Sequence, residues 1–177
     1  PQHSSAASDV YKRQVRDLLL QTECPSWGYM PSAGATTMWE RWNSDVGDVS
    51  MNSHNHYAFG AVIGFFYRRL AGIAPAAPGF RRIAVRPIWF PEVGKVAARY
   101  DSCVGRIATE VDGDENGLSN LRLAVPPNCI AEIELPAGFD WQEHGVPIGE
   151  CDGIHSCRVD GVLIRAEVGS GNYHFVR

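Results

Sequence analysis

The residues best suited to chemistry lie close together in the first half of the chain. Glu40 stands between Trp39 and Trp42, and His56 follows sixteen positions after the glutamate. Cleavage of a glycosidic bond needs a carboxylate that activates water or attacks carbon, and aromatic walls can stack on a sugar ring. This mix of residues therefore suits a sugar-hydrolysing pocket. The alternative from spacing alone is a surface ion pair of Glu40 with Arg41 or Arg81, with the tryptophans in the core.

Histidines near this glutamate could take part in a different chemistry. His54 and His56 are two positions apart, and on the first turn of a helix such side chains diverge, which argues against a metal pair. His56 could donate a hydrogen bond to a sugar hydroxyl or to Glu40, or it could end a helix with its ring bonded to the backbone. Both interpretations of His56 remain open. Residues 112–115 lack the ligand spacing of a calcium loop, so we expect no metal and no other cofactor.

Composition excludes several classes of protein. The chain has 177 residues, 45% of them apolar and 20% charged, which is typical of globular proteins. Its formal net charge is −4 and no basic face is evident, so nucleic acid is not an expected partner. The longest apolar run, residues 57–67, is shorter than the roughly 20 residues that span a bilayer. Five cysteines without a C-x-x-C pair predict free thiols and favour a reducing, cytoplasmic compartment.

The segments around the candidate site read as helices and an extended loop. Residues 1–14 show no periodicity, and we interpret them as a non-native junction. From Val15 a short helical face begins, which we expect to end before Pro25. Residues 34–40 read as extended, which would place Glu40 and Trp42 on the same face.

A second helix is expected immediately after the site. It would start at Asn52 or Ser53, run to about Ala71 and stop at Gly72. Its apolar residues cover almost the whole circumference, so it needs neighbours on nearly all sides.

The period of the sequence changes after residues 75–79, a segment rich in proline and alanine that we interpret as a linker. Residues 80–177 alternate apolar and polar positions in short runs, as in Ile107/Thr109/Val111 and Val162/Ile164/Ala166/Val168. Turn signals at Asp112-Gly113 and Asp160-Gly161 separate such runs. This pattern predicts an antiparallel β-sandwich.

The chain from about residue 15 to its end resembles the bacterial α-L-rhamnosidases. Ordered motifs carry the resemblance: Pro25-Ser26-Trp27-Gly28-Tyr29-Met30, Gly34-Ala35-Thr36-Thr37-Met38-Trp39-Glu40-Arg41-Trp42, Met51-Asn52-Ser53, Asn55-His56-Tyr57-Ala58-Phe59-Gly60, Tyr67-Arg68, Leu70-Ala71-Gly72-Ile73, Pro78-Gly79-Phe80 and Gly169-Ser170-Gly171-Asn172-Tyr173.

The resemblance implies an (α/α)6 barrel followed by a C-terminal β-sandwich, and hydrolysis of terminal α-L-rhamnose with inversion. Residues 15–74 would then be the end of the catalytic barrel. Glu40 would be the general base and His56 would contact the sugar, while alternation adds Trp42 as a lining residue. Twelve helices need about 200 residues or more, so we expect a C-terminal fragment that lacks the general acid and is inactive alone. Its partners would be a rhamnose-containing glycoside and the missing N-terminal part of its own chain.

A function of another class stays open. The sandwich could be a non-catalytic carbohydrate-binding or accessory module. Such a face should carry exposed aromatic side chains in a row, and Trp89, Phe90 and Trp141 are the obvious candidates, although we expect them to pack in loops.

Overall fold

The computed structural model describes residues 5–44 and 53–177, with only the backbone for residues 5–12. The chain divides into two compact units, residues 1–63 and residues 64–177. No helix in the described residues is both long and apolar enough to cross a membrane.

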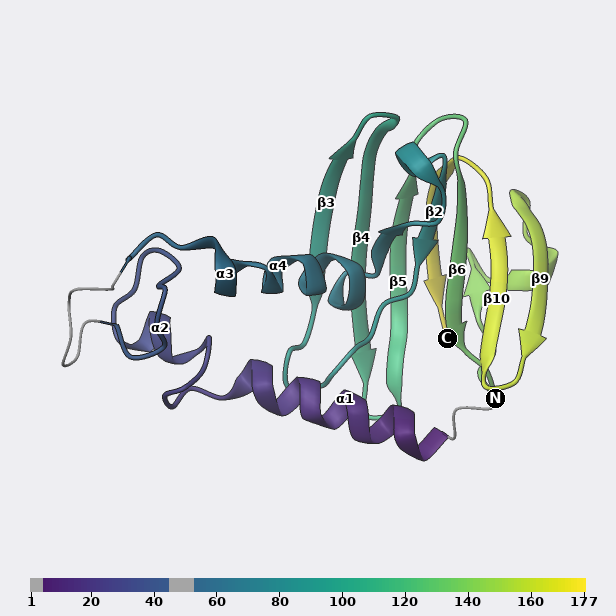
Figure 1. Cartoon of the computed structure of the whole chain (residues 1–177). Coiled ribbons are helices and arrows are strands. Elements are labelled where there is room, and N and C mark those ends of the chain that lie inside the picture. The colour runs from purple at the N-terminus through teal and green to yellow at the C-terminus, as the bar shows by residue number, and fades with distance from the viewer. Residues whose placement is uncertain (1–4, 45–52) are drawn as a thin grey trace. The chain divides into compact units, whose positions relative to one another are not determined.

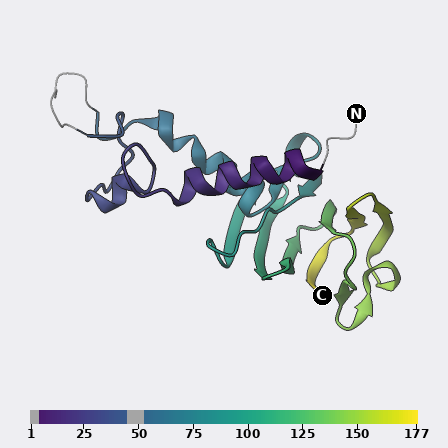
Figure 2. The same ribbon diagram turned by 90° about the horizontal axis from the view of Figure 1, so that it is seen from below.

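The first unit begins with a longer helix than the sequence predicts. Helix α1 spans Ser5–Leu20 and is uninterrupted in both views of Figures 1 and 2. It starts ten residues before the predicted Val15 and ends before Pro25 as expected. Residues such as Ala, Lys, Arg and Gln favour helix without any apolar periodicity, which is why the pattern missed this start. That residues 1–14 are a non-native junction stays a prediction.

Short turns follow α1. The hydroxyl of Ser26 is buried and accepts the N–H of Tyr29 at 3.0 Å, where helix α2 (Tyr29–Ser32) begins. Met30 is buried on this helix. Residues 42–44 form a turn, so the predicted alternation does not continue through Trp42.

The long helix predicted from Asn52 or Ser53 is instead three short helical segments. They are α3 (Tyr57–Gly60), α4 (Val62–Phe65) and the π-helical turn η1 (Phe66–Leu70). Asn52 lies outside the described residues, and His56 rather than Ser53 caps the first segment. Gly60 and Gly64 weaken a continuous helix, since glycine has the greatest backbone freedom to lose.

The predicted stop at Gly72 is confirmed. Its φ is +79°, and a Cβ at this position would lie 2.6 Å from the backbone nitrogen of Pro87. Only glycine therefore fits this turn without strain.

The second unit is a β-sandwich of two sheets. The first sheet has the order β1-β2-β6-β10-β9, with bounds Ile73–Pro75, Arg82–Val85, Ile130–Pro136, Leu163–Val168 and Ile154–Asp160. The second has the order β3-β4-β5-β11-β7-β8, with bounds Val96–Ser102, Gly105–Asp114, Gly117–Val125, Gly171–Val176, Gln142–Glu143 and Val146–Pro147. Two short 3-10 turns, η2 (Pro78–Phe80) and η3 (Ile148–Glu150), connect strands.

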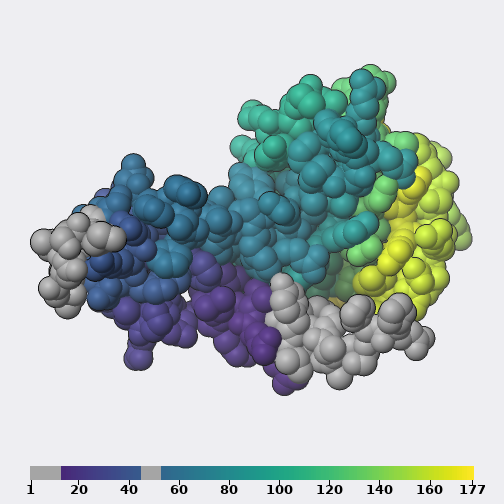
Figure 3. All heavy atoms as spheres, viewed as in Figure 1, coloured from purple at the N-terminus to yellow at the C-terminus, as the bar shows by residue number. Residues whose placement is uncertain are grey.

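Neighbouring strands of the sandwich pair antiparallel, except that β2 pairs parallel with β6. Figure 1 shows β6, β10 and β9 side by side, and the late strands make the right-hand side of the sandwich in the space-filling view of Figure 3. The strand β1 begins at Ile73, ahead of the predicted linker. The domain limits drawn around residues 75–79 stay a prediction.

The core lies between the two sheets and confirms most of the alternating pattern. Inward residues of both sheets, including Leu121, Leu135 and Phe175, are fully buried in one cluster. The hydroxyl of Thr109, also buried, donates to the carbonyl of Ala71 at 2.8 Å.

Two details of the predicted strands are wrong. Val162 is 73% exposed, because it belongs to the turn at Asp160-Gly161 and β10 begins one residue later. Asp112-Gly113 is not a turn but a bulge within β4. A Cβ on Gly113 would lie 2.6 Å from the Trp89 ring, so glycine allows the tryptophan to pack there.

Candidate functional site

Two segments of the first unit lie side by side and bring the predicted site residues together. The N–H of Glu40 donates to the carbonyl of Ser53 at 2.9 Å, and the N–H of His56 donates to the carbonyl of Met38 at 2.8 Å. The segments 38–40 and 53–56 therefore run antiparallel over a short stretch. Glu40 and His56, sixteen positions apart in sequence, therefore lie on two segments that are hydrogen-bonded through their backbones.

The carboxylate of Glu40 is held by the main chain. Oε2 accepts the N–H of Ser53 at 2.8 Å, and the side chain is half-buried. That Glu40 forms a surface ion pair with Arg41 or Arg81 stays a prediction. A carboxylate with one anchored oxygen can use the other as a proton acceptor.

His56 caps α3 with its ring. Its Nδ1 accepts the N–H of Ala58 at 3.2 Å, and the ring stacks on Tyr57 with centroids 5.1 Å apart. Because Nδ1 is an acceptor here, a neutral ring carries its proton on Nε2 and can donate from that atom. His56 therefore ends a helix with its ring bonded to the backbone, as one of the two interpretations predicted. This bond uses Nδ1 and leaves Nε2 able to donate to a ligand.

Trp42 belongs to an aromatic cluster that the sequence analysis did not assemble. Its ring stacks on Phe59 at 3.8 Å between centroids and meets the edge of Trp27 at 5.2 Å. The indole N–H of Trp27 donates to the carbonyl of Phe59 at 3.0 Å, which fixes the cluster. Trp39, by contrast, is buried, as expected for a core tryptophan.

The two histidines do not form a metal pair. Nε2 of His54 lies 3.1 Å from the hydroxyl of Ser44, and its ring tilts against Trp39 with centroids 6.0 Å apart. Across the residues that the structure describes, no three metal-ligating side chains come together. All five cysteines are free thiols, in agreement with the sequence analysis.

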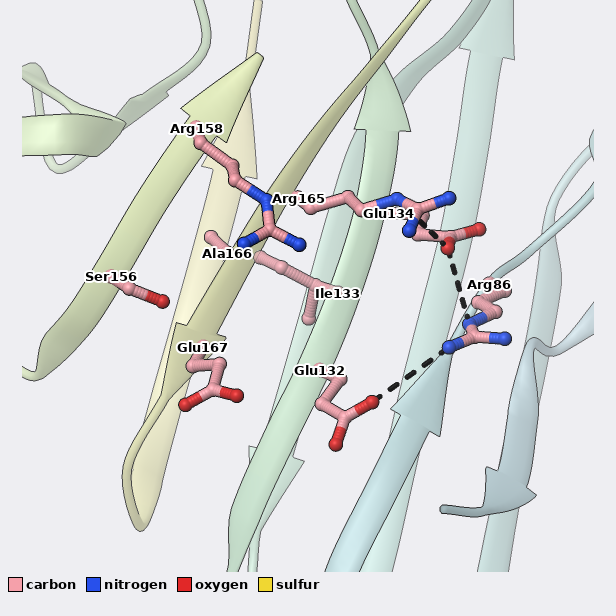
Figure 4. Close-up of a pocket in the computed structure, with 9 residues that line it drawn as sticks. All are labelled: Arg86, Glu132, Ile133, Glu134, Ser156, Arg158, Arg165, Ala166 and Glu167. Atoms are coloured by element: carbon pink, nitrogen blue, oxygen red, sulfur yellow. Dashed lines mark ion pairs between the residues drawn. The ribbon is translucent and has the colours of Figure 1, made fainter. Parts of the chain in front are cut away.

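A pocket of about 160 Å³ lies on the outer face of the first sheet of the sandwich. Figure 4 shows Arg86 between Glu132 and Glu134, at 3.7 and 3.4 Å, and Arg165 lies 3.5 Å from Glu134. These charges neutralise one another. No aromatic side chain lines the pocket, so it offers a sugar ring nothing on which to stack.

The aromatic residues considered for an accessory module are buried or partly buried. Trp141 and Phe90 are buried, and Trp89 packs partly buried against the core. The indole N–H of Trp141 donates to the carbonyl of Pro136 at 2.9 Å. These three residues form no exposed sugar-binding row, so the accessory interpretation loses its candidates.

Comparisons with known proteins cover nearly the whole chain. Residues 5–70 match the family model described as the bacterial α-L-rhamnosidase six-hairpin glycosidase domain, and residues 72–146 match the bacterial α-L-rhamnosidase C-terminal domain. An α-L-rhamnosidase of Streptomyces avermitilis is 39% identical over 163 residues, which are 89% of this chain and 15% of that protein. One of Formosa agariphila is 40% identical over 124 residues, 67% of this chain and 13% of that protein.

Solved structures agree with the sequence matches. The structure of the S. avermitilis α-L-rhamnosidase complexed with L-rhamnose aligns with a TM-score of 0.79 and 35% identity, over 98% of this chain and 16% of that one. The enzyme of Dictyoglomus thermophilum aligns with a TM-score of 0.77 and 32% identity, over 96% and 20%. The chain thus spans about a sixth of the length of these relatives, and the predicted fold class is confirmed. It belongs to the bacterial α-L-rhamnosidase family, with six-hairpin domain sequence followed by the C-terminal domain.

Proposed function

We propose that the complete protein is an inverting α-L-rhamnosidase and that Glu40 is its general base. The observation that carries the proposal is the position of Glu40, half-buried and held through one oxygen by the main chain of Ser53 at 2.8 Å. The family match supports a rhamnoside as substrate, since the S. avermitilis relative was solved with L-rhamnose. His56 would donate from Nε2 to a sugar hydroxyl, and Trp42 would line the sugar-binding site.

Inversion requires a second carboxyl group. In inverting glycosidases the general acid lies roughly 6.5–9.5 Å from the base, on the other side of the scissile bond. We propose that this acid lies outside these 177 residues, which would make the chain inactive by itself. The test is to assay the 177-residue chain on an aryl rhamnoside: turnover like that of the complete protein would contradict this part of the proposal.

The general-base role is tested in the complete protein with Glu40→Gln. Gln keeps the shape and an acceptor oxygen for Ser53 but cannot take a proton. We expect kcat on an aryl rhamnoside to fall at least about a hundredfold. Glu23→Gln is the matched control, because Glu23 is an exposed glutamate of the same unit, and its kcat should stay within twofold of wild type. A Glu40→Gln enzyme within a few-fold of wild type would overturn the assignment.

A further inference from the structure

We infer that Ser53 is a positioning residue for the general base, acting through its main-chain N–H rather than through its hydroxyl. This inference rests on the proposed function of Glu40. One oxygen of the carboxylate is anchored by Ser53, and the other is left to accept the proton of the attacking water.

Two reciprocal hydrogen bonds define the anchor. The N–H of Ser53 donates to Oε2 of Glu40 at 2.8 Å, and the carbonyl of the same serine accepts the N–H of Glu40 at 2.9 Å. The backbone and the side chain of the glutamate are thus held by one residue. A hydrogen bond from a neutral donor to a carboxylate is stronger than one between neutral groups, and a donor on a paired backbone has little freedom to move.

The serine hydroxyl has a different partner. Its Oγ accepts the N–H of Asn55 at 3.3 Å, within its own segment. The anchor therefore needs only a backbone N–H at position 53, which every residue except proline provides.

The same pair of segments fixes the histidine of the site. The N–H of His56 donates to the carbonyl of Met38, and the hydroxyl of Thr37 donates to the carbonyl of His54. Residues 37–40 and 53–56 form one clasp, with Glu40 and His56 both on it. The paired segments therefore fix the position of the base relative to the donor that binds the sugar. Such precision matters because a displacement of about 1 Å can slow a reaction strongly.

The proton transfer follows from this division of the carboxylate oxygens. Water loses a proton to Oε1 of Glu40 while its oxygen bonds to the anomeric carbon. The bond from that carbon to the glycosidic oxygen breaks, and the leaving oxygen takes a proton from the general acid. Oε2 stays on the N–H of Ser53 throughout, so the carboxylate does not rotate as it becomes neutral.

The experiment compares Ser53→Pro with Ser53→Ala in the complete protein. Proline removes the N–H and alanine keeps it. We expect kcat of Ser53→Pro on an aryl rhamnoside to fall about a hundredfold with KM within twofold, because the base and not the sugar is displaced. Ser53→Ala should stay within twofold in both constants.

Azide distinguishes a variant whose general base is misplaced from a variant whose fold is damaged. It is an anion that attacks the anomeric carbon without giving up a proton, so it bypasses the base. We expect azide to restore turnover in Ser53→Pro, as in Glu40→Ala, with release of the inverted glycosyl azide. Thr37→Val loosens the same clasp without changing the backbone, and its kcat should fall severalfold and respond to azide as well.

Several results would overturn the inference. One is Ser53→Pro with wild-type kcat, and another is Ser53→Ala as slow as Ser53→Pro. Ser53→Pro that azide does not restore, together with unchanged Thr37→Val, would also contradict it. If Glu40→Gln is slow while Ser53→Pro is normal, only the positioning role fails. If Glu40→Gln itself is normal, the proposed function fails.

Discussion

The sandwich has a large buried apolar core, although turn residues such as Val162 stay exposed, whereas few apolar residues are buried among the described residues of the first unit. Phe175 and Leu135 in the sandwich are fully buried, whereas Tyr57 is 86% and Ile63 56% exposed in the first unit. A buried core stabilises its own unit, while exposed apolar residues gathered in one region mark a surface that packs against something else. We therefore expect the sandwich to fold around its own core and the first unit to need further partners.

The carboxylates of the two units also differ in their hydrogen-bond partners. On the sandwich, Glu132 and Glu167 lie directly opposite each other on β6 and β10, and Arg82 binds both. These two glutamates hold the pKa of Arg82 above its ordinary value through their hydrogen bonds. Glu40 instead receives a neutral main-chain donor. Glu132 and Glu167 are thus held by a charged side chain, whereas the anchor of Glu40 is an uncharged backbone group.

The largest expected effect contrasts a buried with an exposed aromatic residue. Phe175→Ala should lower the free energy of unfolding by about 3–5 kcal/mol, because it leaves a cavity between the sheets. Tyr57→Ala should change it by less than about 0.5 kcal/mol. Urea unfolding of both variants of the 177-residue chain, followed by circular dichroism, measures the difference. Equal losses for the two variants would remove the contrast between the units.

A dye that fluoresces on apolar surfaces should tell the two units apart. The 177-residue chain should bind such a dye more strongly than residues 64–177 alone, because Leu18, Leu20, Tyr57 and Ile63 are exposed in the first unit. Titration of both proteins at equal concentration gives the comparison. A chain that stays monomeric on gel filtration and binds no more dye than residues 64–177 would contradict it.

The smallest expected effect concerns an exposed ion pair of the sandwich. A hydrogen bond from Arg106 at 2.7 Å, reinforced by its charge, holds the pKa of Asp101 below its ordinary value. A lowered folded-state pKa adds stability above the unfolded pKa, and this is lost as the pH falls through the folded pKa. Asp101→Asn should therefore flatten slightly the fall of Tm between about pH 5 and pH 2.

Both side chains of this pair are mostly exposed, so solvent screens them and the change should be small. Asp152→Asn, another exposed aspartate, is the control and should leave the pH profile unchanged. A large effect of Asp101→Asn would show that surface pairs, and not only the core, decide the stability of the sandwich.

The sequence predicted the strands well because one face of each sheet packs on the core. Alternation then follows directly from burial, as at Ile107, Thr109 and Val111. It failed at Val162 because a tight turn uses an apolar residue without burying it. The long helix was wrong because its apolar content suggested one continuous helix, whereas the structure has three short segments, two of which contain a glycine that weakens a helix.

For the site, residue types and motif pointed to Glu40, His56 and Trp42, and the structure brings Glu40 and His56 onto paired segments. The sequence could not point to Ser53, since its contribution is a backbone N–H that almost every residue possesses. Nor could spacing show that Phe59 and Trp27 enclose Trp42, because contacts across a loop leave no period in the sequence.

The hydrogen bond from Thr109 to Ala71 also matters for protein engineering. Ala71 is part of the sandwich core, and Leu70 just before it is buried as well. A sandwich excised at the proline-rich segment 75–79 would lose both residues and the strand β1. A truncated protein that keeps the sandwich core should therefore start no later than the helical turn η1. A fusion joined at Phe66 keeps the edge strand β1, whereas a fusion joined at Phe80 loses it.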